Sequence, residues 1–167
     1  MKQYQLVLLV IIVTALQVGF LPALRPYGVI PDLLAVVIVA LGLMTTASQT
    51  LICAMAVGLA LDLSSASSFG LHLGVYTVTA LAVSLLARYG IAYDTVAWQV
   101  GLSTLVIVAA HLTILGDLAL HGVALPFGYV EGHIAFGVLW GLVLMLGVLP
   151  LMRRLVVRES MIVSGGR

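Results

Sequence analysis

The chain has 167 residues, of which 63% are hydrophobic and 8% charged, and its mean hydropathy is +1.26. A water-soluble domain carries about 25% charged residues, so this composition excludes a soluble globular protein. The net charge of +1 also excludes a dedicated nucleic-acid-binding protein, which would show a basic domain or stripe. The sequence therefore predicts an all-α, polytopic membrane protein.

Six apolar segments follow one another along the chain. The first, about residues 4–21, resembles a signal peptide, but no polar domain follows it, and we interpret it as an uncleaved span. Because about 20 apolar residues cross a bilayer, further spans are expected at about 31–45, 51–63, 69–87, 95–118 and 132–152. The prediction is a six-helix transmembrane bundle forming one domain over residues 1–167, with a basic tail at 153–167. The second and third segments are short, so a pair of partly embedded helices is an alternative.

Prolines and polar runs separate these segments. The first ends at Pro22, and the second opens at Pro31-Asp32, where proline suits the first turn of a helix. The polar run at residues 45–50 is expected to form a tight turn, and a serine-rich turn at 64–68 follows the third segment.

Charged residues sort to opposite sides of the predicted bundle. Six spans place both termini on one side, together with six of the seven basic residues, namely Lys2, Arg88, Arg153, Arg154, Arg158 and Arg167. The opposite side holds Arg25 and four of the six acids, namely Asp32, Asp62, Asp117 and Glu131. Because basic residues near span ends stay in the cytoplasm, both termini are expected there. The basic rim would also favour anionic membrane lipids.

Asp62 is the most unusual acid, because it falls where the third span ends. A helix C-terminus disfavours negative charge, and an unpaired carboxylate costs roughly 2.5–3.5 kcal/mol deep in hydrocarbon. Compensation is expected from a cation, from the nearby serines or from protonation, and a pair of Arg25 with Asp62 or with Asp32 is the natural hypothesis. The alternative is a solvated Asp62 without a role. If its charge is used, Asp62→Asn should weaken function without unfolding the bundle.

Other polar residues have simpler interpretations. Asp32 at the start of the second span is expected to accept backbone N–H groups as a helix cap. The four histidines, His72, His111, His121 and His133, all map to the acidic side. None of them has the i, i+4 spacing of a helical ligand pair, so packed imidazoles are favoured over a zinc site. The single Cys53 allows no disulfide within the chain.

Small residues recur at four-residue spacing, which permits close approach of membrane helices. The three patterns are Ala54-x-x-x-Gly58, Gly70-x-x-x-Gly74 and Gly137-x-x-x-Gly141. They indicate a compact bundle, with one such face available for a partner. Nucleophile-elbow, zincin and phosphate-loop motifs do not occur in the sequence, so we predict no enzyme activity, no cofactor and no metal.

Two stretches of the sequence resemble the MreD family, the rod-shape-determining inner-membrane proteins of bacteria. The first is Pro31-Asp32-Leu33-Leu34. The second is Gly58-Leu59-Ala60-Leu61-Asp62-Leu63, followed by a serine-rich turn, Phe69-Gly70-Leu71-His72 and Tyr76. The length and the basic tail are also similar, whereas the fifth and sixth spans match by hydropathy alone.

The resemblance implies a non-catalytic scaffold of the cell-elongation (rod) complex, which helps control cell shape and peptidoglycan synthesis. It implies MreC, a single-span protein with a periplasmic domain, as the direct partner. The wider machinery includes MreB, RodA and a class B penicillin-binding transpeptidase. The family's fold is similar to the substrate-binding subunits of energy-coupling-factor transporters. The alternative is therefore a subunit that captures a vitamin-type small molecule, with His72, His111 and Asp62 lining its pocket.

Overall fold

The computed structural model describes residues 3–24, 29–65, 68–89 and 95–164, and only the backbone of Gln3, Val96 and 155–164. All regular elements in these ranges are helices: α1 (Gln3–Ala15), a π-helical turn η1 (Leu16–Phe20), a 3-10 turn η2 (Leu21–Leu24), α2 (Leu33–Met44), α3 (Ala47–Ser64), α4 (Leu71–Arg88), α5 (Val96–Leu120) and α6 (Phe127–Ser164). The fold class predicted from composition is therefore confirmed as all-α.

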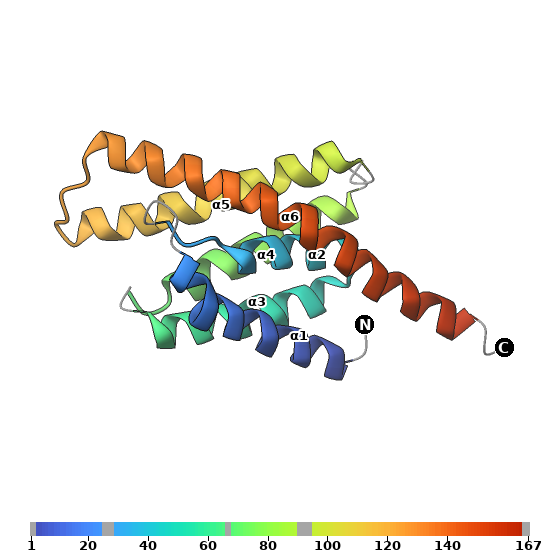
Figure 1. The fold of residues 1–167 in the computed structure, drawn as a ribbon. Coiled ribbons are helices and arrows are strands. Elements are labelled where there is room, and N and C mark those ends of the chain that lie inside the picture. The colour runs from blue at the N-terminus through green and yellow to red at the C-terminus, as the bar shows by residue number, and fades with distance from the viewer. Residues whose placement is uncertain (1–2, 25–28, 66–67, 90–94, 165–167) are drawn as a thin grey trace.

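Successive long helices run in opposite directions, so the bundle has two distinct ends (Figure 1). α1 begins and α6 ends at the same end. At that end the short turn between α2 and α3 also lies, and there α4 ends and α5 begins. The opposite end carries the starts of α2, α4 and α6 and the end of α3.

Helix α2 forms the centre of the bundle. It packs against α3, α4, α5 and α6, and every residue from 33 to 42 is buried. Its 12 residues span only ~18 Å at the α-helical rise. The helix is apolar on all sides, which is the pattern expected of a helix that its neighbours fully enclose.

Five helices are long and apolar enough to cross a membrane within the described residues. These segments are Tyr4–Leu24, Ala47–Ser64, Leu71–Arg88, Ala97–Leu120 and Phe127–Arg154, and α2 is a shorter apolar helix. Large apolar side chains remain exposed along them, such as Ile11, Leu63 and Leu146. In water such surfaces would drive association, whereas lipid tails can cover them. The chain thus has the fold of a multi-pass helical membrane protein.

The predicted turn at residues 45–50 is too long. Helix α3 already begins at Ala47, so only Thr45 and Thr46 connect it to α2. The hydroxyl of Thr45 donates to the Leu41 carbonyl at 2.7 Å, and that of Thr50 donates to the Thr46 carbonyl at 3.2 Å. Hydroxyls that bond to the preceding turn in this way let polar residues lie within helices.

The last helix is longer than the predicted span 132–152 at both ends. Pro126 opens it, and its carbonyl accepts the N–H groups of Tyr129 and Val130. Helix α6 continues through Pro150 to Ser164, so residues 153–164 are helical and do not form a separate tail. Prolines are tolerated within membrane helices because neighbouring groups satisfy the freed carbonyl.

Two of the three small-residue patterns lie at helix contacts. A Cβ atom built on Gly58 would lie 2.6 Å from Leu73 Cα, so α3 and α4 are in close contact here. Cβ atoms built on Gly137 and Gly141 would collide with the side chains of His111 and Ile107 on α5. In the described ranges, no heavy atom lies within 4 Å of a Cβ atom built on Gly70 or Gly74, so this pair makes no close helix contact with the described helices.

Candidate functional site

Asp62 at the end of α3 holds the start of α4. Its carboxylate accepts hydrogen bonds from the backbone N–H groups of Gly70, His72 and Leu73 at 3.0, 2.9 and 3.1 Å. It also lies 3.0 Å from Nδ1 of His72, and none of its side-chain surface is exposed. The first N–H groups of a helix have no intrahelical acceptor, and the helix dipole favours an anion there. Compensation for Asp62 thus comes from a neighbouring helix, and the alternative of a solvated side chain is wrong.

Gly70 gives the chain the geometry that this cap requires. Its φ of +94° lies in the left-handed region, which glycine adopts readily, and it is the residue immediately before α4. The turn directs the Gly70 N–H back toward Asp62. The role of Gly70 is therefore one of backbone conformation.

Asp32 caps α2, as predicted, and also connects α2 to α4. Its Oδ1 atom accepts the Ala35 N–H at 2.9 Å, and the hydroxyl of Tyr76 lies 3.0 Å from both carboxylate oxygens and donates to them. Tyr76 is only 3% exposed. The rings of Tyr76 and His72 are stacked with centroids 6.3 Å apart. Asp32, Asp62, His72 and Tyr76 thus form one polar cluster that joins α2, α3 and α4.

We expect Tyr76→Phe to destabilise the protein by about 2 kcal/mol, because hydrogen bonds to charged groups contribute about 1.5–3 kcal/mol. Unfolding in mixed micelles titrated with dodecyl sulfate would measure the change. Tyr89→Phe is the matched control, because Tyr89 is 80% exposed. Equal stability of the Tyr76 and Tyr89 variants would contradict the contribution of the Tyr76 hydroxyl.

Gln17 is a functional candidate that we did not identify from the sequence. It lies in the π-helical turn η1, where its Nε2 donates to the Pro31 carbonyl at 3.0 Å and its Oε1 accepts the Leu33 N–H at 2.9 Å. Gln17 thus ties the first membrane segment to the start of α2. A single amide within an apolar span was the available signal, because such groups are costly in lipid unless they are paired.

A cavity of about 710 Å³ lies beside the polar cluster. Its volume is within the ~300–1,000 Å³ range of ligand pockets. The polar lining consists of Gln17, Asp32, Ser64, Ser65, His72, Tyr76, His111 and His133, and the apolar lining of Val18, Pro22, Ile30, Leu61, Ile114 and Leu118. His72 and His111 therefore line the cavity as predicted, whereas Asp62 is not among its described lining residues.

His111 of α5 and His133 of α6 form a pair in this cavity. Their rings meet edge to face with centroids 4.9 Å apart, and Tyr129 lies 5.6 Å from His133. His111 is only 4% exposed. Among the described residues, neither of its ring nitrogens has a hydrogen-bond partner, and Nδ1 of His133 has none either. The sequence placed both residues on one side of the membrane, but only the packing of α5 against α6 brings them together.

The remaining candidates lie apart from this cavity. Arg25 falls outside the described residues, so its proposed ion pairs with Asp62 or Asp32 do as well. Gly74 is exposed on α4. Two of the serines considered as donors to Asp62 bond elsewhere: Ser68 donates to Asp117 at 2.6 Å, and Ser64 to the carbonyls of Ala60 and Leu61.

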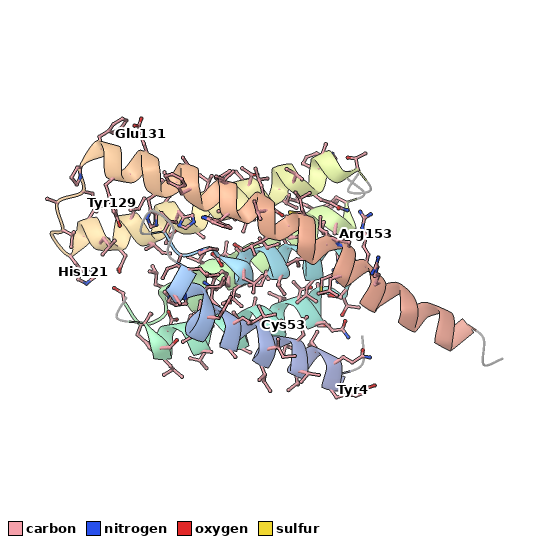
Figure 2. The ribbon with its side chains drawn as sticks, viewed as in Figure 1. Tyr4, Cys53, His121, Tyr129, Glu131 and Arg153 are labelled. Atoms are coloured by element: carbon pink, nitrogen blue, oxygen red, sulfur yellow. The ribbon has the colours of Figure 1, made fainter. Side chains whose placement is uncertain are left out.

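Among the described residues, acidic side chains lie toward one end of the bundle and arginines toward the other. Figure 2 places Glu131 and His121 at one end and Arg153 toward the other. We call the first the acidic end, because α2 and α4 begin and α3 ends there, next to Asp32 and Asp62. The basic end contains Arg88, Arg153 and Arg154, and Arg153 donates to Gln99 at 3.0 Å. Within the described part of the chain, no three His, Cys, Asp or Glu side chains group as metal ligands.

Comparison with known proteins gives no match to a family model, to a curated protein or to a solved structure.

Proposed function

We propose that this chain is a non-catalytic membrane scaffold of the MreD type, which binds the single-span protein MreC in the rod complex of a bacterial inner membrane. In this proposal both termini face the cytoplasm, because the basic end carries Arg88, Arg153 and Arg154 and the acidic end does not gather such residues among its described positions. The complex would extend to MreB, RodA and a class B penicillin-binding transpeptidase.

The single observation that supports this proposal most is that the residues shared with the MreD motif form hydrogen bonds that join helices. Asp32 and Tyr76 bond to one another, and Asp62 bonds to the start of α4. Two stretches that are separated in the sequence thus form one cluster, and the groups within it stabilise helix ends. A scaffold needs such fixed helix positions, whereas a catalyst needs a reactive group that is free to meet a substrate.

The exposed face of α4 is the contact surface that we assign to the partner helix. Val78 and Leu81 are 67% and 47% exposed, and Leu85 is 41% exposed, at helical spacing from the exposed Gly74. Small residues beside apolar ones allow a second transmembrane helix to approach closely, and this packing contributes most of the affinity in lipid. An exposed ion pair would contribute only about 0–1 kcal/mol.

We expect Gly74→Leu to reduce copurification of MreC at least fivefold, because the added side chain would hold the partner helix away from α4. Glu131→Gln is expected to leave the yield nearly unchanged, since Glu131 is an exposed acid. The measurement is the MreC-to-scaffold ratio after gentle detergent extraction of tagged protein.

Gly116→Leu is the matched control for this experiment. Gly116 is also exposed within a membrane helix, and nothing lies within 4 Å of a Cβ atom built on it. Gly70→Leu is unsuitable as a probe, because the positive φ at Gly70 would strain any larger residue. Equal MreC yields from the Gly74, Gly116 and Glu131 variants would count against the α4 surface.

A small-molecule capture subunit is the second candidate function, and the 710 Å³ cavity is the observation that favours it. Native mass spectrometry of gently purified protein tests it, because a captured molecule would add a discrete mass to the chain. Its cavity lies toward the acidic end, which faces outward in the orientation proposed above.

A further inference from the structure

The histidine pair in the cavity lacks the hydrogen bonds that buried polar groups normally make. An unpaired buried donor or acceptor costs about 1–3 kcal/mol, and most such groups in proteins have a partner. Both ring nitrogens of His111 lack a partner within the described part of the chain, although the residue is only 4% exposed. A molecule in the cavity can supply the missing partners.

The polar groups of the cavity lining include acceptors that a ligand can use. Asp32 keeps acceptor capacity, because its Oδ2 atom accepts only the Tyr76 hydroxyl among the bonds described above. A neutral imidazole presents one acceptor nitrogen and one N–H donor, so His111 and His133 can accept from a ligand as well as donate to it. A ligand with N–H groups therefore suits this wall of the cavity.

The charge of the lining selects against anions. Asp32 is an acid, and no Lys or Arg lies among the described residues that line the cavity. Desolvating an anionic ligand beside the Asp32 carboxylate is unfavourable in a medium of low dielectric constant. The same cavity also offers apolar surface from Val18, Ile114 and Leu118.

We propose that this cavity binds a neutral or singly cationic amphiphilic small molecule, whose N–H groups are accepted by Asp32, His111 and His133 and whose apolar body lies against Val18, Ile114 and Leu118. This inference rests on the second candidate function. It names the recognition residues and the ligand class that a capture subunit would have.

A series of equal-sized probes tests the ligand class. The full chain in phosphatidylcholine nanodiscs is titrated with 2-naphthamidine, 2-naphthamide and 2-naphthoate, which share one ring system and differ in charge. We expect saturable binding of the cation and of the neutral amide, with the anion at least tenfold weaker. His111→Phe and His133→Phe keep a ring of similar size, and each should weaken amidine binding at least tenfold.

His121→Phe is the matched control, because His121 is an exposed histidine at the same end and is not part of the cavity lining. It should bind the probes as the wild type does. Thermal unfolding of each variant verifies that the bundle is intact, and if one cavity variant is unfolded the other carries the test. Wild-type affinity in a folded His111→Phe or His133→Phe protein would overturn the proposal.

The proposed ligand class and the capture function fail in different ways. Tighter binding of 2-naphthoate, with an anionic molecule found on the purified protein by native mass spectrometry, would overturn the ligand class and leave capture in place. No saturable probe binding and no copurifying molecule would overturn both, and would indicate a cavity that holds only water or lipid tails.

Discussion

Gly58→Ala is expected to destabilise the protein by about 3 kcal/mol, near the upper end of typical costs for overpacking. The added Cβ atom would lie 2.6 Å from Leu73 Cα and 2.9 Å from the His72 carbonyl oxygen. These atoms belong to the backbone of α4, so no side-chain rotation can relieve the contact. The two helices would have to move apart, which would also stretch the hydrogen bonds that the N–H groups of His72 and Leu73 donate to Asp62.

Unfolding in mixed micelles measures this effect, and Gly101→Ala is its control. Gly101 lies within α5, and nothing lies within 4 Å of a Cβ atom built on it. Alanine there should leave the stability unchanged or raise it by as much as about 1 kcal/mol, because glycine is a poor helix former. A Gly58→Ala protein as stable as the Gly101→Ala protein would show that α3 and α4 are not in close contact.

Asp62→Ala is expected to cost about 4 kcal/mol, the loss typical of removing one member of a buried charged network. The substitution leaves the N–H groups of Gly70, His72 and Leu73 without their acceptor. Asp62→Asn keeps one acceptor oxygen but places an NH₂ group against donors, so about 2 kcal/mol is expected for it.

The stability of the Asp62→Asn protein distinguishes two roles of Asp62: a cap of α4, and a charge that is needed only for function. The sequence alone led us to expect that Asp62→Asn would weaken function and leave the bundle folded. With the carboxylate capping α4, we expect the loss of stability to accompany any loss of function. Glu131→Gln, an exposed acid, is the control and should change stability by less than about 0.5 kcal/mol. An Asp62→Asn protein with wild-type stability would contradict the capping role.

The helical class and the sites of most helices could be predicted because lipid imposes them. Long apolar runs have no alternative to a helix in a bilayer, so hydropathy located both ends of α2, α4 and α5 to within two residues. The errors fell where polar residues belong to helices. Thr50 in the first turn of α3 and the arginines Arg153 and Arg154 in α6 resemble the ends of spans in the sequence, but they lie within helices, and the Thr50 hydroxyl donates to the Thr46 carbonyl.

The candidate site was predictable only in part, because its geometry depends on contacts between helices. A cap can be foreseen when the acid directly precedes its helix, as Asp32 precedes α2. Asp62 lies nine residues before Leu71, where α4 begins, and its position in the sequence indicates only the unfavourable end of α3. The pairing of His111 with His133 depends on Gly137, because the His111 ring occupies the space where a side chain at this position would lie. The spacing of the two histidines carries no signal of that contact.

The shortness of α2 has a consequence for biogenesis. A helix of ~18 Å cannot cross a hydrocarbon core of ~30 Å by itself, yet it is synthesised long before α4 and α6, which flank it in the finished bundle. We therefore expect α2 to remain at the translocon or the membrane surface during translation until these later helices emerge. Truncation before α6 should accordingly leave the early part of the protein open to quality-control proteases.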